Sequence, residues 1–121
     1  MAKILAVDDS PAIRLMVSSV LKKAGHEVTS AEDGVEASRV ADGDAFELVI
    51  TDVHMPNMNG IELIQCLRGK SAYRHTPLLV LTTESSQEMK QRGRAAGATG
   101  WIVKPFDPAS LVNAVSRVLG A

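Results

Sequence analysis

The chain has 121 residues, of which 45% are hydrophobic and 22% charged, and its formal net charge is −1 at pH 7. A single cysteine excludes a disulfide framework and a thiolate metal cage. The near balance of 13 basic and 14 acidic residues, together with few aromatic residues, argues against a nucleic-acid or membrane surface. The apolar stretch at the N-terminus ends at Asp8, so it is not a secretory signal, and we expect one soluble, intracellular domain.

Five short apolar runs predict β-strands. Runs 4–7, 48–51 and 78–81 are nearly continuous in Val, Ile and Leu, which is typical of strands covered on both faces of a parallel sheet. Run 28–31 carries polar residues and is expected at a sheet edge, and run 101–103 forms the fifth strand.

Helical spacing fills the segments between these strands. Apolar residues recur on one helical face from Ile13 to Ala24, and Ser10 is placed to cap this helix. Further helices are predicted over 34–41, from 61 to about 69, over 87–96, and from a cap at Asp107 to about 119. A β-α unit repeated five times indicates an α/β fold with a doubly wound, five-stranded parallel sheet.

Polar residues follow four of the five predicted strands. In open sheets of this kind, ligands bind beyond the carboxyl ends of the strands. If the first and third strands are neighbours, three carboxylates share one cleft with a hydroxyl and an ammonium group beside them. The residues concerned are Asp8 and Asp9, then Asp52, then Thr82 and Thr83, and finally Lys104.

Such a cluster of carboxylates needs a counter-ion, because two like charges 4–6 Å apart repel by roughly 3–4 kcal/mol at an effective dielectric of 20. A hard divalent cation offsets this repulsion, and oxygen ligands without sulfur or imidazole suit Mg²⁺. Mg²⁺ in such sites commonly also binds a phosphate oxygen, while Lys104 and Thr82 are suited to bind two others. The set indicates a phosphoryl-transfer site in which one carboxylate is the nucleophile.

Four segments of the chain match a known family in order and spacing. They are VDDS at 7–10, DVHMPNMNG at 52–60, LTT at 81–83 and KPF at 104–106. With them, the whole chain, 1–121, resembles the receiver domain of two-component response regulators, most closely the single-domain, CheY-like chemotaxis type. The resemblance implies a flavodoxin-like (βα)5 fold with strand order 2-1-3-4-5, a phosphoprotein and a cytoplasmic location.

The resemblance implies a role for each acidic residue. Asp52 would be the phospho-acceptor, Asp9 would ligate Mg²⁺ directly, and Asp8 would act mainly through water. The backbone carbonyl of His54 would complete the protein's share of the metal coordination. We expect a protein that is not an enzyme in the usual sense, although it would catalyse its own phosphoryl transfer and slow autodephosphorylation.

The resemblance also implies how the phosphoryl group would be sensed. Thr82 would bond a phosphoryl oxygen and Lys104 would form a salt bridge to it, with a cis peptide before Pro105. An aromatic side chain on the fifth strand would turn inward and reshape the face of the fourth helix, fifth strand and fifth helix. That side chain is Trp101, where the family usually has Tyr or Phe, so its larger ring is expected to be hindered.

Three neighbouring side chains are expected to adjust the chemistry. His54 and Glu84 lie two residues beyond Asp52 and Thr82, where they flank the route of attacking water and would tune hydrolysis. Thr83 stands where the family often has a small residue. It either narrows access to the phosphoryl group or caps the fourth helix, and the capping role is favoured.

The expected partners are a chemotaxis-type histidine kinase as phosphodonor, a downstream protein target and a phosphatase, with no nucleic acid or membrane. A phosphorelay intermediate or phosphate sink stays open as an alternative to a messenger. An Asp-nucleophile phosphohydrolase is disfavoured, because such enzymes place a second acid where this chain has His54 and also carry a cap. A flavodoxin-like electron carrier is disfavoured because 8–11 (DDSP) would repel a cofactor phosphate.

Overall fold

The computed structural model describes residues 2–120, in which five strands alternate with five α-helices. The strands are β1 (Lys3–Val7), β2 (Glu27–Ala31), β3 (Leu48–Thr51), β4 (Leu78–Thr82) and β5 (Gly100–Val103). The helices are α1 (Pro11–Lys23), α2 (Gly34–Asp42), α3 (Gly60–Arg68), α4 (Gln87–Ala96) and α5 (Pro108–Val118), with a short 3-10 turn η1 (Ser71–Tyr73) before β4. All five predicted strands are present, each within one residue of its predicted ends.

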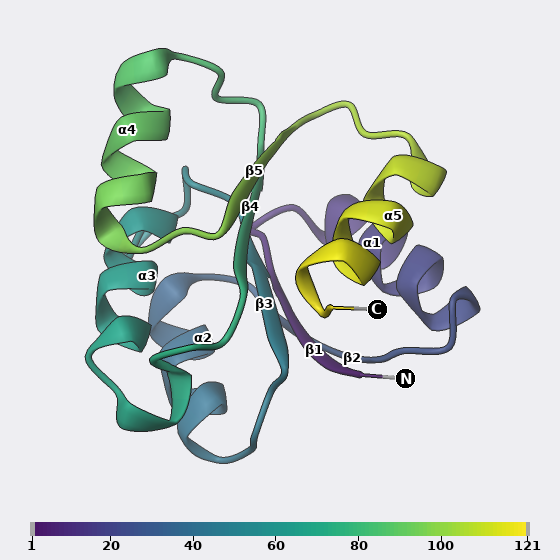
Figure 1. Cartoon of the computed structure of the whole chain (residues 1–121), viewed down its shortest axis with the longest axis horizontal. Helices are drawn as coiled ribbons and strands as arrows, with labels where there is room; N and C mark the ends of the chain where they lie inside the picture. The colour runs from purple at the N-terminus through teal and green to yellow at the C-terminus, as the bar shows by residue number, and fades with distance from the viewer. Residues whose placement is uncertain (1, 121) are drawn as a thin grey trace.

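The strands form one parallel sheet in the order β2-β1-β3-β4-β5, which confirms the predicted α/β fold and places β2 at an edge. Helices α2, α3 and α4 cover one face of the sheet, and α1 and α5 cover the other (Figure 1). No helix in the described part of the chain has the length and apolar character that crossing a membrane requires.

Alternation along β1 divides the core into two layers. Leu5 and Val7 pack in the cluster under α2 and α3, whereas Ile4 and Ala6 pack in the cluster under α1 and α5. All four side chains are buried. Burial on both faces explains why the central strands read as continuous apolar runs in the sequence.

The helices begin at side-chain caps. Ser10 accepts a hydrogen bond from the Ile13 backbone N–H, as predicted. For α4 the prediction was wrong, because Ser86 rather than Thr83 accepts from the N–H of Met89. The helix begins at Gln87, so Thr83 lies too early in the chain to reach the free N–H groups of its first turn.

The register of β1 against β3 brings the two acidic segments together. Val7 lies opposite Thr51, so that Asp8 and Asp52 follow directly paired residues. The Asp52 N–H donates to the Val7 carbonyl (3.0 Å) and the Asp8 N–H donates to the Ala31 carbonyl (3.1 Å). Sheet hydrogen bonding therefore fixes the backbone of both carboxylates.

The start of α3 packs closely under the same backbone. A Cβ at Gly60 would overlap the Asp52 carbonyl oxygen and lie 3.0 Å from the Val53 Cα. We expect Gly60→Ala to destabilise the protein by about 3 kcal/mol, the upper end for overpacking, because a backbone carbonyl cannot move aside. Urea unfolding measures this. The control is Gly43→Ala, whose Cβ would lie 3.7 Å from the Val40 carbonyl, and equal stability of the two variants would contradict the prediction.

Candidate functional site

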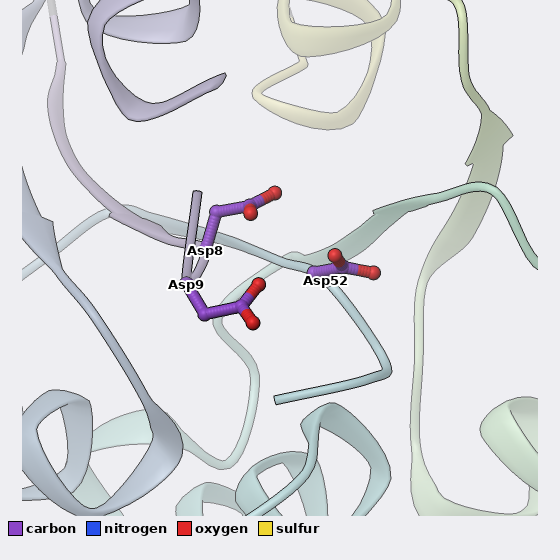
Figure 2. Close-up of side chains that lie close together, drawn as sticks. All are labelled: Asp8, Asp9 and Asp52. Carbon is purple, nitrogen blue, oxygen red and sulfur yellow. The ribbon is translucent and has the colours of Figure 1, made fainter. Parts of the chain in front are cut away.

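Three carboxylates meet at the carboxyl ends of β1 and β3. Asp8, Asp9 and Asp52 each offer an oxygen, and these oxygens all lie within 4.8 Å of one another. Figure 2 shows Asp8 and Asp9 approaching from one strand end and Asp52 from its neighbour. Asp8 and Asp52 are buried, whereas Asp9 is exposed. The expectation that the acidic residues converge in space is confirmed.

Lys104 lies across two of these carboxylates. Its Nζ donates to Asp8 Oδ2 (2.8 Å) and to Asp52 Oδ2 (3.2 Å). Burial alone would lower the pKa of Lys104, but the two carboxylates outweigh it and raise that pKa, so the side chain is charged at neutral pH. The peptide bond between Lys104 and Pro105 is cis, as the resemblance implied.

Asp8 makes contacts that the sequence did not indicate. Its Oδ1 accepts from the Ser10 N–H (2.9 Å), and its backbone carbonyl accepts from the Arg14 guanidinium (2.6 Å). Burial raises the pKa of the Asp8 carboxyl, and the hydrogen bonds from Lys104 and Ser10 oppose that rise without cancelling it. The ionised form of Asp8 is therefore held at a cost to folding.

The raised pKa of Asp8 sets the sign of a stability prediction. Because the folded state favours the protonated Asp8, this carboxyl adds most to the free energy of unfolding below the ordinary Asp pKa of about 4. That addition is lost as pH rises through the raised pKa. In metal-free buffer at pH 7, Asp8→Asn is therefore expected to unfold a few degrees above the parent chain, with the gap closing in acid. Differential scanning calorimetry measures both midpoints. A lower midpoint for the variant at pH 7 would mean that the ion pair with Lys104 outweighs burial.

The donor set fits a hard divalent cation. Within residues 2–120 the cluster consists of three carboxylates, with neither sulfur nor imidazole among its grouped ligands. Oxygen ligands of this kind are those that Mg²⁺ prefers. Repulsion between the carboxylates would fall on binding, so the residues present suit the ion.

The loop after β4 connects the other residues expected at the site. Thr82 is fully buried, and its Oγ1 accepts from the Glu84 N–H (3.3 Å). A carboxylate oxygen of Glu84 lies 3.0 Å from Nε2 of His54, and this contact lowers the pKa of Glu84. The His54 ring thus pairs with Glu84. The side chain of Thr83, which stands between Thr82 and Glu84 in the sequence, is exposed.

Trp101 belongs to the same group of contacts. Its indole N–H donates to the Glu84 carbonyl (2.9 Å), and the half-buried ring packs with the cluster under α4. A Cβ at Gly93 would lie 2.6 Å from the indole Cζ3. The larger ring therefore fits against α4 because Gly93 has no side chain, and the sequence did not indicate this contact.

Comparisons with known proteins show which family and which relatives this chain resembles. The profile of the response regulator receiver domain family matches residues 4–116. The chain is 38% identical over 120 residues to the chemotaxis protein CheY1 of Helicobacter pylori, with 98% of this chain and 97% of that protein covered.

Two solved structures are similar along their whole length. The chemotaxis protein CheY4 of Vibrio cholerae has 53% sequence identity and a TM-score of 0.94, with 98% of each chain covered. The receiver domain of the sensor histidine kinase PA1611 of Pseudomonas aeruginosa has 27% identity and a TM-score of 0.92, with 99% of this chain and 98% of that chain covered. That domain was solved with a magnesium ion coordinated in its active site cleft.

Proposed function

The chain belongs to the response regulator receiver domain family, and we propose that it is a phosphorylation-dependent switch that acts as a stand-alone chemotaxis-type messenger. Receivers of this type take a phosphoryl group from a histidine kinase and act on a downstream protein. One observation carries the proposal: three carboxylate oxygens lie within 4.8 Å of one another, and Lys104 bonds two of the carboxylates.

Asp52 is the proposed phospho-acceptor. One of its oxygens forms a bond to phosphorus as the bond from phosphorus to a ring nitrogen of the donor's phosphohistidine breaks, and the imidazole leaves. The Val53 N–H binds Asp52 Oδ1 (2.7 Å) and Lys104 binds Oδ2, so the carboxylate is oriented before the donor arrives. Lys104 then neutralises part of the charge on the incoming group. Slow hydrolysis of the acyl phosphate restores the carboxylate.

Mg²⁺ is the proposed cofactor. Asp9 and Asp52 would hold it directly, Asp8 through water, and the backbone carbonyl of His54 would add a further oxygen. When bound, the ion neutralises charge on the transferring phosphoryl group. The magnesium ion in the cleft of the Pseudomonas receiver domain supports this assignment.

Thr82 and Trp101 are the proposed sensing residues. The Thr82 Oγ1 accepts from Glu84, which leaves its own proton free to donate to a phosphoryl oxygen. Glu84 also accepts from the Trp101 indole through its carbonyl. A shift of Thr82 toward the phosphoryl group would thus move Glu84 and change the bond to Trp101. The face formed by α4, β5 and α5 would then change shape, and the target reads it.

His54 and Glu84 are the proposed tuning residues, together with Thr83. The contact between the His54 ring and the Glu84 carboxylate joins the loop after β3 to the loop after β4. Because the two loops directly follow Asp52 and Thr82, this bridge would limit the approach of water to the acyl phosphate.

The fluorescence of Trp101 tests the switch, since it is the single tryptophan of the chain. We expect Mg²⁺ with beryllofluoride, an acyl-phosphate mimic, to change the emission of the indole because its bond to Glu84 is altered. Mg²⁺ alone and beryllofluoride alone serve as controls. Emission that stays constant when both are present would remove Trp101 from the switch.

A further inference from the structure

The loop between β3 and α3, residues 53–59, is tied to a second element of the fold at its middle. The Asn57 side-chain Nδ2 donates to Asp33 Oδ2 (2.8 Å). Asn57 has a φ of 69°, which is the one left-handed backbone among the non-glycine residues that the structure describes. Asn tolerates this conformation better than most side chains. The loop therefore bends at Asn57 and places its amide against the start of α2.

Asp33 uses its two carboxylate oxygens for two different elements. Oδ1 accepts from the Glu36 N–H (2.9 Å) and caps α2, while Oδ2 accepts from Asn57. The residue is buried, with 8% exposure. Beside it, the Gly34 N–H donates to the Met58 carbonyl (3.2 Å). Helices α2 and α3 pack against each other on the same face of the sheet, as Figure 1 shows, so the loop is fixed to a rigid neighbour.

The ends of the loop are held separately. The Gly60 N–H donates to the Val53 carbonyl (2.9 Å), and Asn59 caps α3 through the Glu62 N–H (2.8 Å). Between these ends lies His54, whose carbonyl is the proposed metal ligand. The hydrogen bond from Asn57 to Asp33 joins the middle of the loop to the start of α2, beside the Met58 side chain that packs on Gly34.

We propose that Asp33 and Asn57 are positioning residues for Mg²⁺, because they hold the backbone of residues 53–59 in the shape that presents the His54 carbonyl to the acidic cluster. This inference rests on the proposed function. Mg²⁺ requires near-ideal octahedral geometry, so a loop that samples other shapes lowers the fraction of molecules ready to bind. Neither residue touches the ion or the reacting atoms in this assignment.

Two substitutions each remove the hydrogen bond between Asn57 and Asp33 while they preserve the local backbone or the helix cap. Asn57→Gly removes the amide donor and keeps the left-handed backbone, which glycine adopts without strain. Asp33→Ser keeps a good helix cap but is too short to reach Asn57. Asp42→Asn, which removes one exposed carboxylate from the other end of α2, controls for the loss of charge in Asp33→Ser.

Calorimetric titration with MgCl₂ measures the dissociation constant of each protein. We expect Asn57→Gly and Asp33→Ser each to weaken Mg²⁺ binding about tenfold, the lower end for outer-shell changes, and Asp42→Asn to leave it within about twofold. The double variant is expected to be no weaker than the weaker single variant, because both changes remove one contact. Thermal midpoints are measured in parallel.

The two assignments fail in different ways. If the parent chain binds Mg²⁺ and both variants bind it equally well, the positioning role is wrong, even where their thermal midpoints fall. Additive losses in the double variant would also overturn it, since the residues would then act separately. A parent chain that binds no Mg²⁺ would overturn the proposed function together with this inference.

Discussion

Asp52→Asn is expected to accept no phosphoryl group from either phosphoramidate or a phosphorylated histidine kinase. The amide oxygen is a poor nucleophile, whereas it can still accept the hydrogen bond from Val53 that orients the carboxylate. The side chain is nearly the same size, so the fold should persist. Intact-protein mass spectrometry after incubation with the donor and Mg²⁺ measures the covalent adduct.

Asp107→Asn is the matched control for that experiment. Asp107 caps α5 through the Ser110 N–H, and Asn caps helices as well as Asp does. This variant should label like the parent chain. Full labelling of Asp52→Asn would show that another residue is the acceptor, and the assignment of the site would fail.

Removal of Mg²⁺ is expected to slow the same labelling reaction by more than about a hundredfold, because a divalent cation supplies several kcal/mol of charge stabilisation to the transferring group. Chelation with EDTA followed by addition of MgCl₂ tests this in one sample. Labelling that proceeds at full rate in EDTA would contradict the proposed role of the ion.

Asp9→Asn is the most specific change for the metal. Asp9 is exposed, and its side chain makes no hydrogen bond with the rest of residues 2–120. Its substitution therefore breaks no hydrogen bond within that part of the chain. Mg²⁺ at a hundred times its dissociation constant should stabilise the parent chain by about 2.7 kcal/mol. We expect this gain to be largely absent in Asp9→Asn and retained in Asp42→Asn, as thermal midpoints with and without Mg²⁺ would show. An undiminished gain in Asp9→Asn would exclude Asp9 as a ligand.

Much of the fold was predictable because it depends on local patterns. The three central strands appear as apolar runs since both of their faces are covered, and the polar residues of the second run matched an edge strand. The helix caps Ser10 and Asp107 were predictable because each stands directly before a proline that begins a helix.

The contacts around Glu84 were not predictable in the same way. Glu84 meets His54 through its side chain and Trp101 through its carbonyl, which are 30 and 17 residues away along the chain. The room for the Trp101 ring comes from Gly93, whose lack of a side chain has no meaning until α4 lies on β5. The helix α4 begins at Gln87 as predicted, but its cap was assigned to Thr83 instead of Ser86, because both residues are plausible caps in isolation.

The sequence by itself determined the order of strands and helices and which side chains follow each strand, because apolar periodicity and caps act over a few residues. In a parallel sheet the carboxyl ends of all strands lie at the same edge, so Asp8, Asp9 and Asp52 could be expected to lie close together. The tertiary structure alone decided that Lys104 bonds both Asp8 and Asp52, and that Asn57 ties its loop to α2. Those contacts depend on ångström-scale packing between segments far apart in the chain, for which no local pattern exists.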